Sequence, residues 1–263
     1  MTNPRPRRAS KQQAPSEEPA RYCDQPACPS ASGCTAARAE AFLLLGPCGT
    51  RPLGPPWVPA GIVERPDAAL GERIAARAAR HSLSQIALIA AQRDDLPDGG
   101  SETLAAAVRA IRRASPATRV EITCGDFGRE ARCLRAVLAA RPQQFHVGLG
   151  TCPRLYPKVL PGCDYVAMLE CLRVAREEFE TIRLKATLSF GLGETRDELV
   201  ASIADLKSVR VEELCLAPAP PELRRGAGPS AEWVERVALV ARKLAFDRVA
   251  VLAEPRPCGV ICE

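Results

Sequence analysis

The sequence predicts an α/β protein built on a parallel sheet. From about residue 41, short apolar runs rich in β-branched residues alternate with amphipathic segments. About six or seven such units follow one another, which favours right-handed βαβ crossovers. Polar or Gly-rich stretches follow several of the apolar runs: Gln92–Gly100, Gly125–Arg129 and Gly191–Thr195. A full or partial barrel and a doubly wound open sheet are both compatible with this pattern, and each places a ligand at the carboxyl ends of the strands.

The individual elements follow from periodicity and end signals. The expected strands are Ala41–Gly46, Gln85–Ala91, Arg119–Cys124, Gln144–Gly150, Ile182–Gly191, Glu213–Ala219 and Arg248–Glu254. The expected helices are Asp67–Arg80, Ser101–Ser115, Gly128–Arg141, Asp164–Glu180, Thr195–Val209 and Ser230–Ala245. Thr195 and Glu198 have the spacing of a capping box. The segment Pro47–Pro59 contains five prolines and is expected to be an irregular loop after the first strand.

Composition indicates a globular protein with one large domain. The chain has 263 residues, of which 46% are apolar and 25% charged. It has no apolar run of the roughly 20 residues that a membrane span needs. Residues 1–22 are polar, basic and Pro-rich, without the apolar core of a secretory signal, and are expected to be a disordered tail. The net charge of +5 is modest. We therefore expect a cytoplasmic protein with neither a nucleic acid nor a membrane as partner.

The cysteines are the unusual feature of the composition. The chain has twelve, and three of them, Cys23, Cys28 and Cys34, form a C-x4-C-x5-C motif on a segment expected to be irregular. Three thiolates so close together can hold zinc or an iron–sulfur cluster, with Cys258 or Cys262 available as a fourth ligand. The spacing differs from the C-x2-C pairs of common zinc sites. A metal site and unconnected thiols remain alternatives at this point.

Scattered polar residues have simple structural interpretations. Asp94, Asp95 and Asp98 surround a Pro-Asp-Gly turn and fit a solvated loop. Lys185 lies on an otherwise apolar strand, so it should have a carboxylate or ligand partner. Of the two histidines, His81 is expected at the surface and His146 in the interior. Four scattered cysteines are expected to be small buried apolar residues: Cys133, Cys163, Cys171 and Cys215.

Six sequence blocks together resemble one family. CDQPACPSASGC is followed by RAEAFLLLG, and then by QRDDLPDGG, GDF, PRLYPKVLPGCDY and KATLSFGLGET. Their order and spacing, from Cys23 to Cys258, are similar to those of lipoyl synthases, members of the radical SAM superfamily. The resemblance implies a partial radical-SAM-type TIM barrel with an N-terminal cysteine-rich extension. It also implies a sulfur-inserting transferase that uses S-adenosylmethionine, a radical-generating 4Fe-4S cluster and an auxiliary 4Fe-4S cluster.

The resemblance also assigns residues to sites. It implies an auxiliary cluster on Cys23, Cys28 and Cys34, with Cys258 at the position of the family's serine ligand. Cofactor contacts are implied for Lys185, Gly191, Gly193 and Glu194. Substrate or structural contacts are implied for Arg93, Asp94, Asp95, Asp98 and Arg154.

The chain departs from the family where the radical is made. The family's C-x3-C-x2-C motif falls on Gly49, Leu53 and Pro56, none of which can ligate iron, although Thr50 and Arg51 match its intervening residues. Cys48 stands alone. The family block F-N-H-N-L-E reads FHVGLG, residues 145–150, and G-Q-Y-L-Q-P-S becomes APAPPELRR, residues 217–225.

We therefore expect a catalytically degenerate homologue, a pseudoenzyme that keeps one auxiliary 4Fe-4S cluster. Its domains would be a tail (1–22), a cysteine segment (23–40) and a barrel (41–263) whose C-terminal end returns to the auxiliary site. Its partners would be lipoyl carrier domains of 2-oxoacid dehydrogenases, the glycine cleavage H protein, or an active lipoyl synthase. One alternative is an active enzyme whose radical cluster uses Cys48 with Cys124 or Cys152. A second alternative is a simple metal- or iron–sulfur-binding protein.

Overall fold

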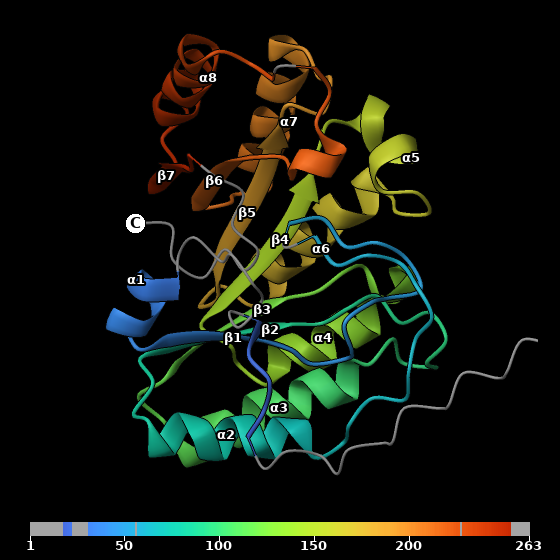
Figure 1. Ribbon diagram of the computed structural model, residues 1–263, viewed down its shortest axis with the longest axis vertical. Helices are drawn as coiled ribbons and strands as arrows, with labels where there is room; N and C mark the ends of the chain where they lie inside the picture. Colours follow the sequence, from blue (N-terminus) through green and yellow to red (C-terminus); the bar gives the residue numbers. More distant parts are fainter. Residues whose placement is uncertain (1–17, 23–30, 56, 227, 254–263) are drawn as a thin grey trace, which may run out of the picture.

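The protein is an open half-barrel of seven parallel strands covered on its outer face by helices, as seen in a computed structural model (Figure 1). The structure describes residues 18–22, 31–55, 57–226 and 228–253. The strands are β1 (Ala39–Leu43), β2 (Gln85–Ile89), β3 (Arg119–Thr123), β4 (Gln144–Gly150), β5 (Arg183–Phe190), β6 (Glu213–Pro218) and β7 (Arg248–Val251). The helices are α1 (Ala31–Ala36), α2 (Leu70–Arg80), α3 (Ser101–Ala114), α4 (Ala131–Ala139), α5 (Tyr156–Val159), α6 (Tyr165–Glu178), α7 (Arg196–Ser208) and α8 (Ala231–Lys243). Three 3-10 turns are η2 (Phe127–Arg129), η3 (Pro153–Leu155) and η4 (Pro221–Leu223).

The strand order distinguishes the two predicted architectures. The strands pair in the sequence order β1-β2-β3-β4-β5-β6-β7, each parallel to the next. A doubly wound sheet needs a point where the strand order reverses, and this order has none. Within the described residues β7 does not pair with β1, so the barrel is partial. The prediction of a partial TIM-type barrel is confirmed.

Burial explains why each strand is apolar. All seven residues of β4 are buried, with Phe145, Val147 and Leu149 packed in the hydrophobic core. His146 lies between these residues and is also buried, and side chains alternate between the two faces of a strand. One face therefore packs against helices, while the other carries a row of polar groups inside the half-barrel.

Helix ends follow the sequence signals. Thr195 and Glu198 form the predicted capping box of α7, in which each side chain bonds the other residue's backbone N–H. The side chain of Asp164 accepts hydrogen bonds from the first backbone N–H groups of α6, and that of Ser230 accepts one at the start of α8. Such caps satisfy N–H groups that the helix itself leaves without partners.

Two expectations about the N-terminal region were wrong. The cysteine segment is not irregular throughout, because α1 places Cys34 on a short helix with the thiol residue buried. The tail expected to be disordered through residue 22 contacts the body from Glu18, which forms ion pairs with Arg77 and Arg80 of α2. Tyr22 is buried in the hydrophobic core. This burial of an aromatic ring, and the ion pairs, fix residues 18–22 against the body.

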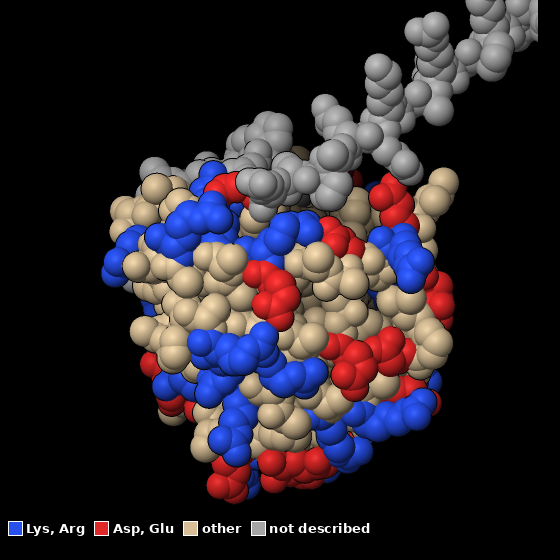
Figure 2. Space-filling view, turned by 90° about the horizontal axis from the view of Figure 1, so that it is seen from below, with Lys and Arg blue, Asp and Glu red and all other residues tan. Residues whose placement is uncertain are grey.

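The surface charges are mixed rather than segregated. On the face that Figure 2 shows, basic and acidic side chains alternate. Ion pairs on α2 and α3, such as Arg113–Glu72 at 2.9 Å and Arg73–Asp67 at 2.6 Å, have this pattern. A nucleic-acid-binding face is instead strongly basic. None of the helices within the described ranges has the length and apolar content of a membrane span.

Candidate functional site

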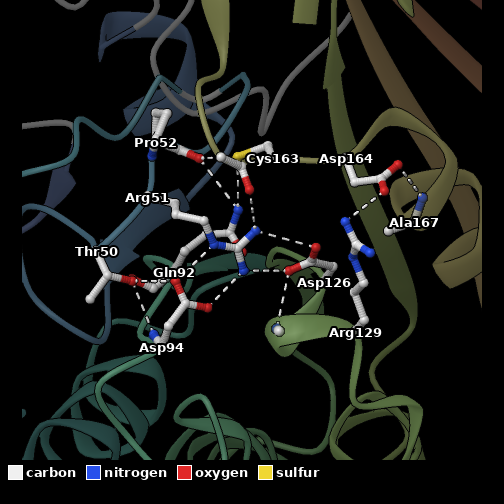
Figure 3. A network of polar contacts seen from close by, with 12 residues as sticks. Thr50, Arg51, Pro52, Gln92, Asp94, Asp126, Arg129, Cys163, Asp164 and Ala167 are labelled. Carbon is white, nitrogen blue, oxygen red and sulfur yellow. Dashed lines mark hydrogen bonds and ion pairs between the residues drawn. The ribbon is translucent and has the colours of Figure 1, made fainter. Parts of the chain in front are cut away.

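An arginine clamp ties together three loops at the carboxyl ends of the strands (Figure 3). Arg51, in the loop after β1, donates from Nε and Nη2 to the two oxygens of Asp94, both at 2.7 Å. Its Nη2 also donates to Oδ1 of Asp126 at 2.7 Å. Asp94 follows β2 and Asp126 follows β3. The rigid guanidinium fork matches this bidentate geometry, so the clamp fixes the relative positions of three loops.

The clamp is strongly charged and partly shielded from water. The hydrogen bond from Arg51 holds the pKa of Asp94 below its ordinary value, and Thr50 Oγ1 adds a further bond to this carboxylate at 2.6 Å. Asp126 has a side chain only 2% exposed. Because Arg51 is its cationic partner, a buried carboxylate would remain without compensation if Arg51 were removed.

A second group of contacts lies next to the clamp. Gln92 Nε2 donates to the carbonyl of Pro52 at 3.3 Å and approaches Cys163 Sγ at the same distance. The thiol of Cys163 donates to the same carbonyl at 3.1 Å. Burial raises the pKa of Cys163, which keeps it protonated at neutral pH. Cys163 is therefore a hydrogen-bonding thiol rather than the buried apolar residue that the sequence suggested.

Charged residues of the RDDLPDGG block stabilise the loop after β2 and the start of α3. Arg93 is buried and donates to both oxygens of Asp95 at 2.8 Å and to the carbonyl of Leu45 at 2.8 Å. Asp98 accepts hydrogen bonds from the backbone N–H of Gly100 and of Glu102 in the first turn of α3. An acidic group at this helix end is favourable.

The GLGET turn after β5 is closed on itself. Glu194 accepts from the backbone N–H of Gly191 at 2.7 Å and of Leu192 at 2.8 Å, so each carboxylate oxygen has a partner. Arg154 of η3 pairs with Glu198 and donates to the carbonyl of Gly193 at 3.0 Å. Gly191 and Gly193 have φ values of +91° and +100°, which favour glycine.

A buried polar row crosses β3, β4 and β5 inside the half-barrel. Lys185 Nζ lies 3.3 Å from both oxygens of Glu121, which is the carboxylate partner that the sequence predicted. His146 is hydrogen-bonded to Thr123 at 3.0 Å and to Thr187 at 2.8 Å, as expected for an interior histidine. Burial, and then the charge of Lys185, hold the pKa of His146 well below its ordinary value, so the imidazole is neutral.

The loop after β1 leaves no room for a cysteine at the first position of the radical-cluster motif. Gly49 donates to the carbonyl of Pro59 and accepts from Gly61, both at 2.9 Å. A Cβ on Gly49 would lie 2.6 Å from the carbonyl oxygen of Gln92. Any side chain here therefore requires the backbone to move. Leu53, at the second position, is a buried core residue, and Pro56 lies outside the described residues.

The same loop rests directly on β4. A Cβ on Gly54 would lie 2.2 Å from the carbonyl oxygen of Gly148, and a Cβ on Gly148 would lie 2.0 Å from that of Pro55. Residues 146 and 148 share the inner face of the strand. The loop thus occupies the inner face at the mouth of the half-barrel, where it lies against Gly148 and Gly150. At these two positions the resembled family has asparagine and glutamate.

Some of the candidate ligand cysteines lie outside the described residues, and others are described. Cys23, Cys28 and Cys258 lie outside the described residues, and of the auxiliary motif only Cys34 is described. Among the described residues no three His, Cys, Asp or Glu side chains come together as a metal site. Cys48, Cys124 and Cys152 are all described, and no group of three such residues includes them. Burial raises the pKa of Cys124 and of Cys152, which opposes the thiolate form a ligand needs.

A strained turn follows β3. Phe127, Gly128 and Arg129 have consecutive φ values of +49°, +64° and +70°. Two of them carry side chains, and such conformations cost about 1–3 kcal/mol each. Arg129 is exposed and forms an ion pair with Asp164 at 2.8 Å (Figure 3). The turn places Arg129 at the start of α6, where this ion pair forms.

Sequence reasoning missed the clamp residues Arg51 and Asp126 and the buried partner Glu121. Arg51 stood out only as a residue that matches the family's motif, because nothing in a Pro-rich loop indicates which carboxylate an arginine will bind. Glu121 had a usable signal, since a charged residue inside an apolar strand needs a buried partner on a neighbouring strand.

Curated relatives of this chain are lipoyl synthases, although no family model matches it. The lipoyl synthase of Rubrobacter xylanophilus is 34% identical over 194 residues, which cover 74% of this chain and 60% of the relative. That of Oleidesulfovibrio alaskensis is 38% identical over 184 residues, 70% of this chain and 62% of the relative. The chain thus spans about three fifths of the length of these relatives.

Solved structures share the fold at low identity. SuiB of Streptococcus suis bound to S-adenosylmethionine superposes with a TM-score of 0.61 and 7% identity, over 86% of this chain and 54% of that one. Methylornithine synthase superposes with a TM-score of 0.53 and 10% identity, over 76% of this chain and 66% of that one. A third structure is the radical S-adenosylmethionine methyltransferase TsrM of Kitasatospora setae, with tryptophan and a SAM analogue. It superposes with a TM-score of 0.51 and 14% identity, over 70% of this chain and 36% of that one. These likenesses show that the chain shares its half-barrel fold with these proteins.

Proposed function

From the homology of this chain to the lipoyl synthases, we propose that it is a non-radical member of their group that binds lipoyl carrier domains. The proposal has three parts. The chain lacks the radical-generating cluster, it keeps an auxiliary iron–sulfur site, and it recognises an octanoylated or lipoylated lysine on a carrier domain. The carrier domain would belong to a 2-oxoacid dehydrogenase or be the glycine cleavage H protein.

The observation that carries the first part is the fit of the loop after β1. A 4Fe-4S cluster that chelates S-adenosylmethionine needs three protein thiolates. Gly49 and Leu53 stand at two of the three positions. Because a Cβ on Gly49 would meet the carbonyl oxygen of Gln92 at 2.6 Å, the position is closed even to a substituted cysteine. The residues at these positions therefore do not fit the cluster that would chelate S-adenosylmethionine.

The second part rests on donor chemistry. Cys23, Cys28 and Cys34 supply three thiols, and Cys258 would supply a fourth in place of the family's serine. Thiolates are the ligands that iron–sulfur clusters use. In lipoyl synthases the auxiliary cluster supplies sulfur. A fourth thiolate would make the cluster in this chain a permanent one, with the segment 23–40 as its platform and the barrel 41–263 as its support.

The third part rests on the order of the strand-end loops. The clamp of Arg51 and the pairs Arg93–Asp95 and Arg154–Glu198 fix the turns after β1, β2, β4 and β5. Such a pre-ordered rim loses little entropy when a partner binds. A non-catalytic role at this rim is to hold an acylated carrier domain, alone or together with an active lipoyl synthase.

A direct test compares carrier domains that differ only at the modified lysine. Binding of the full chain to octanoylated, lipoylated and unmodified carrier domain would be measured by surface plasmon resonance. The proposal predicts tighter binding of an acylated form than of the unmodified domain. Absence of binding to all three forms would contradict the carrier-domain role and favour a simple metal-binding protein.

A further inference from the structure

A small apolar cleft lies between α4 and α6, on the outer side of the half-barrel. Its volume is about 390 Å3, which is within the roughly 300–1,000 Å3 range of small-molecule sites. Leu134, Cys171 and Val174 form its buried apolar wall, and Val166 lies at its rim with 70% of its surface exposed. An exposed valine beside an apolar hollow loses water contact when a ligand enters.

One end of this α4–α6 cleft carries a single available cation. Arg129 lines the cleft with 68% of its side chain exposed, and its ion pair with Asp164 uses only Nη2. No other partner of its guanidinium occurs among the described residues. Asp164 is held by backbone N–H groups of α6, so its position does not depend on Arg129. Arg129 can therefore accept a second carboxylate without giving up the first.

The charges around the cleft leave one cation for an anionic ligand. Asp126, Asp164 and Glu170 also line it. These carboxylates would repel a phosphate or a dicarboxylate, while Arg129 provides a bidentate partner for one carboxylate. The small side chains of Ala131 and Ala167 leave space in the cleft, and none of its lining residues is aromatic.

We propose that the α4–α6 cleft binds a straight-chain aliphatic monocarboxylate. The alkyl chain lies against Leu134, Cys171 and Val174, and the carboxylate is held by Arg129. The strained turn at residues 127–129 is what positions this guanidinium over the cleft. The site lies outside the barrel mouth and does not depend on the proposed carrier-domain function.

Isothermal titration calorimetry of the full chain with octanoate tests the site, with acetate and 1-octanol as probes that each lack one half of the ligand. We expect octanoate to bind at least tenfold more tightly than either probe, since a hydrogen bond to a charged group contributes about a factor of ten. Equal binding of octanoate and 1-octanol, or no binding of octanoate, would overturn the proposal.

Variants separate the site from the rest of the surface. Arg129→Asn removes the cation while asparagine tolerates the positive φ, so the fold is kept, and octanoate affinity should fall at least tenfold. Ala167→Phe should fill the cleft and abolish binding. Arg132→Asn is the matched control, because Arg132 lies three residues after Arg129, in α4, is 76% exposed and pairs with Glu130. If Arg132→Asn weakens binding as much as Arg129→Asn does, octanoate is held by general surface charge and the proposal fails.

Discussion

At the scale of single residues, the charged side chains of the site hold the strand-end loops to one another. Arg51 binds Asp94 and Asp126, Arg93 binds Asp95, and Glu194 caps its own turn. The resemblance had implied cofactor or substrate contacts for several of these residues. In the structure these residues bind protein partners, and their implied ligand contacts stay a prediction.

Replacing Arg51 should destabilise the fold. Arg51→Met leaves the buried carboxylate of Asp126 without its cation, and we expect a loss of about 3 kcal/mol in the free energy of unfolding. Urea denaturation followed by circular dichroism measures it. The matched control is Arg132→Met, which removes an exposed pair and should change stability by less than about 1 kcal/mol. Equal effects of the two substitutions would mean that the clamp contributes no more than a surface ion pair.

The Arg154–Glu198 pair makes a prediction about acid pH. Hydrogen bonds from Arg154 and from the Thr195 backbone lower the pKa of Glu198 from 4.5 to about 2. Because the pKa in the folded state is the lower one, the folded state binds fewer protons than the unfolded state, and stability falls as pH decreases from 4.5 toward 2.

The pKa of Glu198 is directly measurable by carbon-detected NMR titration of the side-chain carboxyl. In Arg154→Gln the midpoint should rise toward 4.5, because the largest cause of the shift is removed. An unchanged midpoint in that variant would show that the backbone bond at the helix start, rather than the arginine, sets the pKa.

At the scale of elements, the loop after β1 and strand β4 are matched to each other. Gly54 and Pro55 of the loop lie against Gly148, where no Cβ fits on either side. The sequence predicted an irregular loop here, and the strands, helices and capping box to within a few residues, because periodicity and end signals are local. It did not predict what the loop touches, since Gly54 and Gly148 are far apart in the chain and neither carries a side chain to indicate a partner.

Adding a methyl group at Gly148 should break this contact. In Gly148→Ala the new Cβ would lie 2.0 Å from the carbonyl oxygen of Pro55, and the loop must move. We expect a loss of about 1–3 kcal/mol in unfolding free energy and faster amide exchange in residues 49–55, measured by hydrogen–deuterium exchange. Gly61→Ala is the control, because its Cβ would meet only the side chain of Cys48, at 3.3 Å. Unchanged exchange in Gly148→Ala would show that the loop does not depend on β4.

At the scale of the whole molecule, the chain combines an open half-barrel with a mouth in which the backbone of the loop after β1 lies against β4. The fold class was predictable because seven βα units leave a repeated pattern in the sequence. The departure from the resembled family's C-x3-C-x2-C motif at Gly49, Leu53 and Pro56 was also visible in the sequence. The absence of space at Gly49 was not visible, because it arises from the packing of Gln92 across the loop.

The proposed function requires that this chain, although similar to lipoyl synthases, carries out no radical SAM chemistry. The most direct measurement is the formation of 5′-deoxyadenosine after anaerobic reconstitution with iron and sulfide, in the presence of S-adenosylmethionine and a reductant, with iron and sulfide counted in the same sample. We predict about four iron and four sulfide per chain, from one 4Fe-4S cluster, and no 5′-deoxyadenosine above the level without protein. About eight of each, together with 5′-deoxyadenosine, would contradict the account, because a second cluster would then form at a mouth that has no place for it.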